Sequence, residues 1–275
     1  MKKENIKSSN SKIIFGDCLE LMQQLPDNSF DIAIADPPYN VSKGNKWSWD
    51  SSANVPGFGG NWTKFMAQWD DMSLGQYMDF SIAWISQLKR IIKPTGSIWV
   101  HGTYHNIGLV NFVLQMLEVE IINEVIWYKR NSFPNLSGRR LTASHETILW
   151  AHTGSSKSRK YNFNYEKSKE MTFPGDMMKL EGKQMRTVWD IPNNKLKSEL
   201  EHGKHPTQKP LRVSKRILEI SAKSNDKVLI PFAGSGTECI AAMELGLEFL
   251  AYENDPEYFE LAQRRLNSHQ PILNF

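Results

Sequence analysis

Near the C-terminal end of the chain, a short apolar run leads through a glycine-containing turn into a helical pattern. The apolar run covers residues 227–230, the turn holds Gly234 and Gly236, and the helical pattern continues to about Leu245. Glycine allows a tight turn and lets a ligand approach the backbone closely. A second apolar run, residues 248–252, is followed by Glu253, which stands 19 residues after Gly234. A carboxylate at that spacing is where ribose hydroxyls are bound, so the pattern predicts a site for a nucleoside cofactor.

The same turn limits which cofactor it suits. Cys239 stands where a pyrophosphate-binding turn has its third glycine. A cofactor without a diphosphate is therefore favoured, and S-adenosyl-L-methionine is one. A plain strand–helix connection and an NAD-dependent dehydrogenase are the alternatives that this turn alone leaves open. The residues expected at the cofactor are Phe232, Gly234, Ser235, Gly236, Thr237 and Glu253.

The rest of the chain alternates short apolar runs with helical patterns, which predicts an α/β fold with a doubly wound, mostly parallel sheet covered on both faces. Strands are expected at residues 12–15, 30–35, 97–101, 121–128, 146–151, 227–230 and 248–252, with a turn at 93–96. Helices are expected from Asp17 to about Leu25 and over residues 74–92, 106–117, 211–222, 237–245 and 256–266. Asp255 followed by Pro256 is a helix start signal.

Between residues 152 and 200 the periodicity fades, and the chain becomes polar, basic and punctuated by glycine and proline. We therefore expect a catalytic half at residues 12–151, an inserted target-recognition region at 152–200 and a cofactor-binding half at 201–270. Residues 155–186 alone carry eight Lys and Arg side chains. A solvated polar face is the alternative explanation for such a run. A second long segment, residues 40–72, is rich in Gly, Asn, Ser and Trp and is expected to be functional or mobile.

The apolar strand at residues 30–35 is followed directly by Asp36, Pro37, Pro38 and Tyr39. The two prolines end the strand and fix the backbone. They hold the Asp36 carboxylate, the Pro37 carbonyl and the Tyr39 ring as one rigid group. Such a group suits a planar base that carries an amino group, because the two oxygens can accept the amino hydrogens while the ring stacks on the base. A tight turn with a surface aromatic is the purely structural alternative.

With these motifs in this order, the sequence resembles the DNA amino-methyltransferases, and most of all their β-group, in which Asp-Pro-Pro-Tyr precedes Phe-x-Gly-x-Gly. Residues 16–19, 188–192 and 205–210 are similar to three further segments of that family. The resemblance implies a Rossmann-like methyltransferase fold in permuted order, with S-adenosyl-L-methionine as cofactor. It implies that Asp17 meets the cofactor adenine and that Thr207 and Lys209 lie beside its methionine end. Ile230 is a departure, because the family usually has an Asp there, near the methionine ammonium.

The activity that the resemblance implies is methyl transfer to N6 of adenine in DNA, with Asp36, Pro37, Pro38 and Tyr39 as the catalytic group. N4 of cytosine is the alternative acceptor, since it presents a similar amine beside a ring nitrogen. A non-enzymatic DNA-binding module is less favoured, because every proposed chemical residue is present. The side chains expected at the DNA are Arg139, Arg140, Arg159, Lys160, Lys183 and Arg186.

The resemblance also suggests partners. It is consistent with a homodimer and with a cognate restriction endonuclease that acts on the same site. The run from Ile230 to Cys239 is similar to that of small adenine methyltransferases of GATC restriction systems.

Composition argues against several other classes of protein. The chain has only two cysteines, Cys18 and Cys239, which are too few for a disulfide framework or a cysteine metal site, so no metal is expected. No apolar run approaches the roughly 18 residues that span a membrane, and the N-terminus does not resemble a signal peptide. We therefore expect no membrane association and a cytoplasmic location. The net charge of +3 does not by itself indicate nucleic-acid binding.

Overall fold

A computed structural model of the chain describes residues 11–40, 72–132, 134, 138–154, 159–170, 176–177, 179–193, 196–203 and 205–269. Its strands are β1 (Lys12–Phe15), β2 (Phe30–Ala35), β3 (Ile92–Gly102), β4 (Glu120–Tyr128), β5 (His145–His152), β6 (Val188–Asp190), β7 (Lys227–Ile230) and β8 (Glu248–Glu253). Its helices are α1 (Cys18–Met22), α2 (Leu74–Ile91), α3 (Ile107–Met116), α4 (Tyr165–Glu170), α5 (Lys197–Leu200), α6 (Leu211–Ser221), α7 (Thr237–Glu244) and α8 (Pro256–Ser268).

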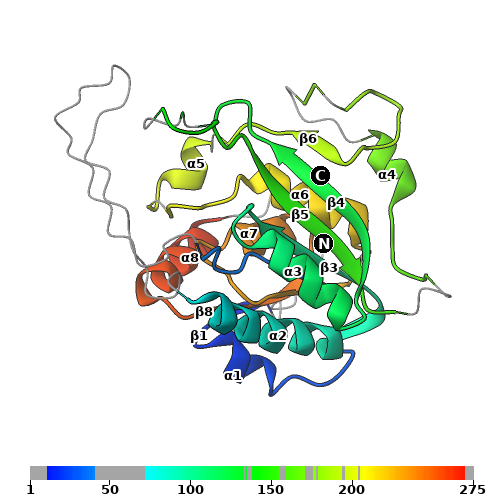
Figure 1. The fold of residues 1–275 in the computed structure, drawn as a ribbon, viewed down its shortest axis with the longest axis vertical. Helices are drawn as coiled ribbons and strands as arrows, with labels where there is room; N and C mark the ends of the chain where they lie inside the picture. Colours follow the sequence, from blue (N-terminus) through cyan, green and yellow to red (C-terminus); the bar gives the residue numbers. More distant parts are fainter. Residues whose placement is uncertain are drawn as a thin grey trace, which may run out of the picture.

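The strands form one sheet in the order β1-β8-β7-β2-β3-β5-β4-β6 (Figure 1). Every neighbouring pair is parallel except the two pairs made by β5, which runs antiparallel to β3 and to β4. The predicted mostly parallel sheet is thus confirmed. Because the parallel strands share one direction, they all end at the same edge of the sheet, called here the carboxyl edge. The opposite edge, where they begin, is the amino edge.

Both faces of the sheet are covered by helices. Successive strand side chains point to opposite faces, so in β2 Ile32 packs on one side and Ala33 on the other. The first face lies under α6 and α7 and includes a tryptophan cluster, in which the rings of Trp99 and Trp150 stack 4.8 Å apart. The second face lies under α1, α2 and α3. Because both faces are buried, ligands can reach the sheet only at its edges and loops.

Local sequence accounts for the helix starts. Ser73 and Gln76 form a capping box at α2, and Asp17 and Asp255 cap α1 and α8 with their side chains. Each cap satisfies backbone N–H groups that the first turn leaves without a partner. Among the described residues, no helix combines the length and apolar character needed to cross a bilayer.

Strand β3 differs from the sequence prediction. It begins at Ile92 and passes through residues 93–96, where a turn was expected. The pairing with β2 jumps from Phe30–Ile92 to Ile32–Ser97, so the extra residues bulge out of the ladder. A Cβ on Gly96 would lie 2.4 Å from the Asp31 carbonyl oxygen, which explains why glycine occupies the bulge. The lysine, proline and glycine that indicated a turn therefore mark an irregular strand.

The segment 152–200 is partly built into the catalytic sheet. Strand β6 pairs in parallel with β4 and forms the outer edge of the sheet. Trp189 at its centre is buried in the tryptophan cluster, and the Trp127 indole donates to the Ile191 carbonyl oxygen at 2.6 Å. Sequence periodicity did not reveal β6, because three residues are too few to show an alternating pattern. Its place in the sheet comes from the burial of Trp189.

Candidate active site

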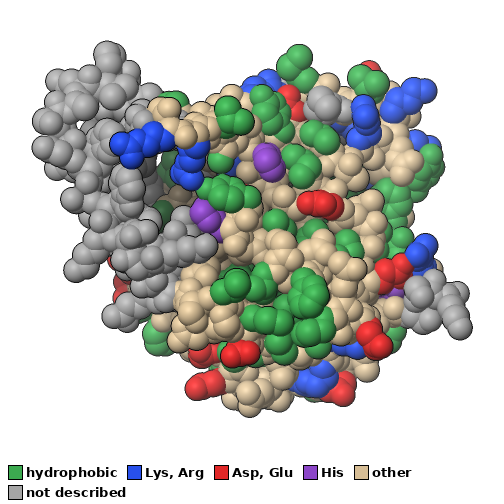
Figure 2. Space-filling view, in the orientation of Figure 1, with side chains coloured by type: hydrophobic (Ala, Val, Ile, Leu, Met, Phe, Trp, Pro, Cys, Tyr) green, Lys and Arg blue, Asp and Glu red, His purple; other side chains and the backbone are tan. Residues whose placement is uncertain are grey.

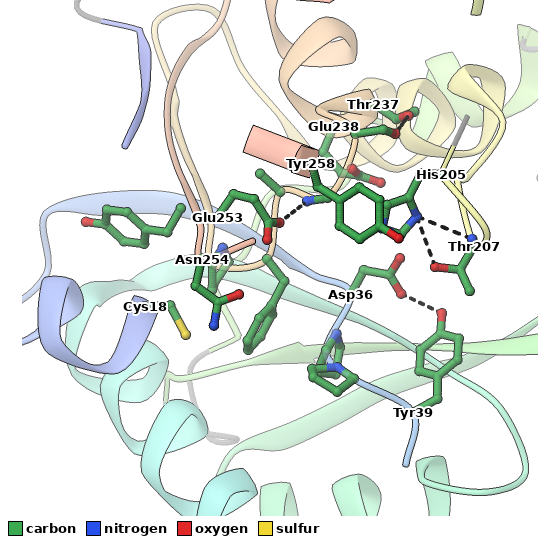
Figure 3. A pocket seen from close by; sticks show the side chains of 18 of the residues that line it. Cys18, Asp36, Tyr39, His205, Thr207, Thr237, Glu238, Glu253, Asn254 and Tyr258 are labelled. Carbon is green, nitrogen blue, oxygen red and sulfur yellow. Dashed lines mark hydrogen bonds between the residues drawn. The ribbon is translucent and has the colours of Figure 1, made fainter. Parts of the chain in front are cut away.

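A cavity of about 330 Å³ opens at the carboxyl edge, where β1, β8, β7 and β2 end (Figure 3). Ligands of open α/β sheets bind at this edge. The cavity is lined by all the residues predicted at the catalytic and cofactor sites except Gly236. Near one end of the cavity, Figure 3 shows Glu253 and Asn254 with Cys18, and near the other it shows Asp36 with Tyr39. The predicted residues, far apart in the sequence, thus come from neighbouring strand ends.

Asp36 is held by two side chains. The Tyr39 hydroxyl donates to its Oδ1 at 2.5 Å, and Lys209 Nζ donates to its Oδ2 at 2.7 Å. Lys209 also donates to the Tyr39 hydroxyl oxygen at 2.6 Å and lies 3.5 Å from Glu146 Oε2. The Lys209 side chain is only 2% exposed. The carboxylate is therefore fixed in place by a buried cation and a phenol.

The charges of this group keep Asp36 ionised. Burial by itself would raise the pKa of Asp36, but the opposing contributions, of which the charge of Lys209 is the largest, together lower that pKa below its usual value. Burial by itself would lower the pKa of Lys209, but the charges of Asp36 and Glu146 hold it above its usual value. Beside them, burial lowers the pKa of His101 to about 4, so this imidazole is neutral near pH 7. Asp36 is thus a hydrogen-bond acceptor with no proton of its own.

The glycine turn after β7 forms the opposite wall of the cavity. Gly234 and Gly236 have φ values of +49° and +76°, a region that favours glycine. Glu253 Oε2 accepts from the Gly234 N–H at 2.6 Å, and Oε1 accepts from the Asp255 N–H at 2.9 Å. Arg265 of α8 donates to the Ser235 carbonyl oxygen at 2.6 Å. These contacts hold the turn and the acid in a fixed relation.

This arrangement has relatives among known proteins. A family model described as DNA methylase (N6_N4_Mtase) matches residues 30–264. The chain belongs to this DNA methylase family. The methylase is 39% identical over 267 residues to the type II methyltransferase M2.LlaDCHI of Lactococcus lactis subsp. cremoris, which covers 97% of this chain and 93% of the relative. It is 34% identical over 278 residues to the type II methyltransferase M.HinfI of Haemophilus influenzae, covering 100% of this chain and 73% of that one.

Solved structures resemble the methylase along most of its length. The crystal structure of an M1.HpyAVI–SAM complex is 25% identical, with a TM-score of 0.63, and the match covers 93% of this chain and 98% of that one. The PvuII DNA methyltransferase, described as cytosine-N4-specific, is 17% identical with a TM-score of 0.71, over 96% of this chain and 89% of that one. At that identity the second likeness shows the fold alone. The fold is the Rossmann-like fold of DNA methyltransferases.

The cavity of the methylase fits a nucleoside cofactor on its own geometry. Glu253 offers carboxylate oxygens beside the glycine turn, and Phe232 provides an apolar wall that packs on Phe80 and Trp84. Asp17 lies at the same end, although its Oδ1 already accepts from the Leu19 N–H at 2.6 Å. Adenosine therefore has a carboxylate for its ribose and an apolar surface for its base.

The basic residues predicted at the DNA lie at both edges of the sheet. Arg140 donates to the Tyr104 hydroxyl at 2.7 Å, and Tyr104 follows β3, so this arginine is at the carboxyl edge. Arg159 pairs with Glu120, the first residue of β4, and is thereby at the amino edge. Exposed side chains complete the set: Arg139 beside Arg140, Lys160 beside Arg159, and Lys183 and Arg186 before β6. None of the six lines the cavity.

Several cavity residues were not predicted from the sequence. Glu238 in the first turn of α7 and Tyr258 of α8 both line the cavity, and Arg265 braces its wall. Helical periodicity gave no reason to single them out, since each looks like an ordinary residue of an amphipathic helix. Lys209 was expected at the methionine end of the cofactor; the structure shows its ammonium bonded to Asp36 and Tyr39. The tryptophans of residues 41–71 lie outside the described residues.

Proposed function

We propose that this DNA methylase methylates N6 of adenine within a short specific DNA site. S-adenosyl-L-methionine is the methyl donor. The observation that carries the proposal is the ionised Asp36, fixed at the cavity by Lys209 and Tyr39. It stands at the end of β2, next to the strand that carries the glycine turn.

The chemistry requires an acceptor for amino hydrogens. The amino nitrogen of adenine is a poor nucleophile, because its lone pair is delocalised into the ring. Asp36 and the Pro37 carbonyl oxygen accept the two amino hydrogens and draw the lone pair out of conjugation. They also stabilise the positive charge that develops on the nitrogen. An acceptor that is charged before the base arrives needs no reorganisation during the reaction.

When bound, S-adenosyl-L-methionine supplies a methyl group that its sulfonium activates. The amino lone pair forms the new N–C bond while the C–S bond breaks and its electron pair remains on sulfur. The nitrogen then loses one proton to Asp36, which passes it to solvent. Positioning of the base against the methyl group supplies further rate acceleration. The cysteines take no part: burial raises the pKa of the Cys18 thiol to about 12 and that of Cys239 well above its usual value.

Tyr39 has a place in this scheme as a stacking platform. Its hydroxyl is tied to Asp36 and Lys209, and the Lys209 ammonium lies beside that hydroxyl, 5.0 Å from the ring centroid. A base flipped out of the duplex would stack on a face of the ring, with its amino group directed at Asp36. The ring is thus locked before the base binds.

The DNA is assigned to the carboxyl edge, because the cavity opens there. Figure 2 shows Lys and Arg side chains gathered over the loop that joins β4 to β5, which also lies at this edge. Arg139 and Arg140 belong to that loop and suit phosphate contacts. The named relatives are type II methyltransferases. By that likeness we propose a role in a restriction-modification system, with a cognate endonuclease cutting the same site and a homodimer as the assembly.

The direct test is to methylate DNA with the purified protein and digest the product to nucleosides for mass spectrometry. N6-methyladenine is expected. N4-methylcytosine would overturn the choice of base while leaving the DNA methylase activity intact. Single-molecule sequencing of DNA from an expressing host then identifies the methylated motif, and GATC is the first motif to examine. Sedimentation of the purified protein tests the dimer.

A further inference from the structure

Four carboxylate side chains from the described residues line the cavity: Asp17, Asp36, Glu238 and Glu253. Three of them already have assigned tasks. Asp17 caps α1, Asp36 holds Lys209 and Tyr39, and Glu253 accepts from the backbone of the glycine turn. The proposed chemistry uses Asp36 and the cofactor ribose uses Glu253. Glu238 is the cavity carboxylate to which neither motif assigns a role.

Glu238 is buried yet faces the cavity. It is only 4% exposed, and its Oε1 accepts a hydrogen bond from the Ser214 hydroxyl at 3.0 Å. Burial and the charge of Asp36 together raise the pKa of Glu238 to about 6. A carboxylate kept next to another carboxylate in a buried site is costly unless a cation is bound beside it. Lys209 and Arg265 both act on Glu238 by their charge. Lys209 nevertheless donates to Asp36 at 2.7 Å, and Arg265 donates to the Ser235 carbonyl oxygen at 2.6 Å.

The shape of the cofactor brings such a cation to Glu238. The cofactor sulfur carries three substituents: the methyl group, the ribose and an amino-acid chain with an α-ammonium. Placing the ribose at Glu253 and directing the methyl group toward Asp36 leaves the third substituent beginning at the reacting end of the cavity. Glu238 is at this end, since its charge acts on both Lys209 and Tyr39. Ile230, by contrast, is an apolar residue fully buried in the sheet and offers no charge to the cavity.

We propose that Glu238 binds the α-ammonium of the cofactor's methionine portion, with Ser214 orienting the carboxylate. The inference rests on the proposed use of the cavity for S-adenosyl-L-methionine. The first turn of α7 then provides the carboxylate that is absent at Ile230, where the family usually has an Asp. Glu253 then binds the nucleoside part of the cofactor, and Glu238 binds its amino-acid part.

A ligand-by-variant cycle tests this contact without DNA or turnover. Calorimetry would compare S-adenosyl-L-homocysteine with its analogue lacking the α-amino group, on the wild-type protein and on Glu238→Gln. In the wild type, loss of the amino group should weaken binding about tenfold, as expected for a charged hydrogen bond. In Glu238→Gln the two ligands should bind within about threefold of each other. An equal amino-group effect in both proteins would overturn the inference.

Two controls make the result specific. Glu253→Gln should weaken both ligands by the same factor, because its carboxylate meets the ribose that they share. Glu238→Asp keeps the charge, and it replaces Glu238→Gln in the cycle if the latter does not fold. Its shorter side chain should reduce the effect of removing the amino group. An undiminished effect would count against the inference. If the wild type bound neither ligand, the proposed cofactor site itself would be wrong. An undiminished amino-group effect in the Glu238 variants rejects only the role of Glu238.

Discussion

The catalytic group at Asp36 and the basic segment at residues 155–186 are built on opposite principles. Tyr39 and Lys209 are buried and Asp36 is partly buried; the three are bonded to one another and carried by strand and turn ends that prolines hold rigid. The described part of the basic segment consists of short elements, with Arg159, Lys160, Lys183 and Arg186 exposed. The methyl-transfer reaction is the same at every target base, so it benefits from a preorganised group of side chains. DNA contacts require side chains that extend from the surface. The two regions should therefore fail in different ways when changed.

The largest effect is expected at Asp36. Asp36→Ala removes the acceptor for the amino hydrogens, so methyl transfer should fall by at least about a hundredfold, while S-adenosyl-L-methionine binding stays within a few fold. The variant also leaves Lys209 buried without its nearest carboxylate, so the melting temperature should drop. Asp36→Asn is the matched variant, because its amide keeps one oxygen acceptor and the shape of the side chain. Turnover above a few per cent of wild type in both folded variants would remove Asp36 from the chemistry.

The distinction between the two regions also explains how far the sequence alone could go. The strand ends at Asp36 and Gly234 were predictable, because proline, glycine and short apolar runs constrain the backbone locally. That β2 and β7 are neighbours was not predicted, because the order of the strands depends on how the whole sheet assembles. The contacts of Lys209, Glu238 and Arg265 were not predictable, since each depends on how separate elements meet in space. Strand β6 is too short to show a pattern of its own, and the tryptophan cluster on which it packs is assembled from distant strands.

Lys209 is the next test, because its ammonium is bonded to Asp36 in the cavity where the cofactor is expected. Lys209 holds the pKa of Asp36 below its usual value, against the burial that raises it. Lys209→Met removes the largest contribution that opposes burial, so the pKa of Asp36 should rise. The active carboxylate is then lost at a higher pH as the solution is acidified, and the acid limb of the kcat/KM profile should move upward. A rate loss of about tenfold or more is expected even on the plateau.

The control for Lys209 keeps the same substitution at a different ion pair. Lys215→Met breaks a pair with Glu244 on the surface between α6 and α7, 2.8 Å long in the wild type. It should leave the pH profile unchanged. An unshifted acid limb in Lys209→Met would show that Lys209 does not set the ionisation of Asp36.

Glu253 should affect cofactor binding and spare the chemical step. Its carboxylate accepts backbone N–H groups of Gly234 and Asp255, and it has oxygen lone pairs left for the ribose hydroxyls. Glu253→Ala should weaken S-adenosyl-L-methionine binding by about 1.5–3 kcal/mol, measured by calorimetric titration. The rate at saturating cofactor should change far less than in Asp36→Ala. An unchanged dissociation constant in a folded variant would remove Glu253 from the cofactor site.

The smallest single effects are expected from the arginines and lysines predicted to contact DNA. The expected effect of each depends on where it lies relative to the sheet. Arg139→Ala and Arg140→Ala, at the carboxyl edge, should each weaken DNA binding and lower the salt dependence by about one ion per phosphate contact. Arg159→Ala and Lys160→Ala should have little effect, because Arg159 is paired with Glu120 at the amino edge, away from the cavity. Lys183 and Arg186 lie just before the edge strand, and alanine variants of both distinguish phosphate contacts from base contacts. Loss of a base contact should weaken binding by about 1–3 kcal/mol on the preferred site alone.

Fluorescence anisotropy across a salt series, on specific and scrambled duplexes, measures all six variants in one format. None should change kcat at saturating DNA and cofactor, in contrast to Asp36→Ala, which should lower it. If Arg159 and Lys160 carried the salt dependence while Arg139 and Arg140 did not, the DNA would have to reach the amino edge. The duplex would then wrap around the outer strand β6, and the recognition surface would be centred on residues 152–200 and not on the loop between β4 and β5.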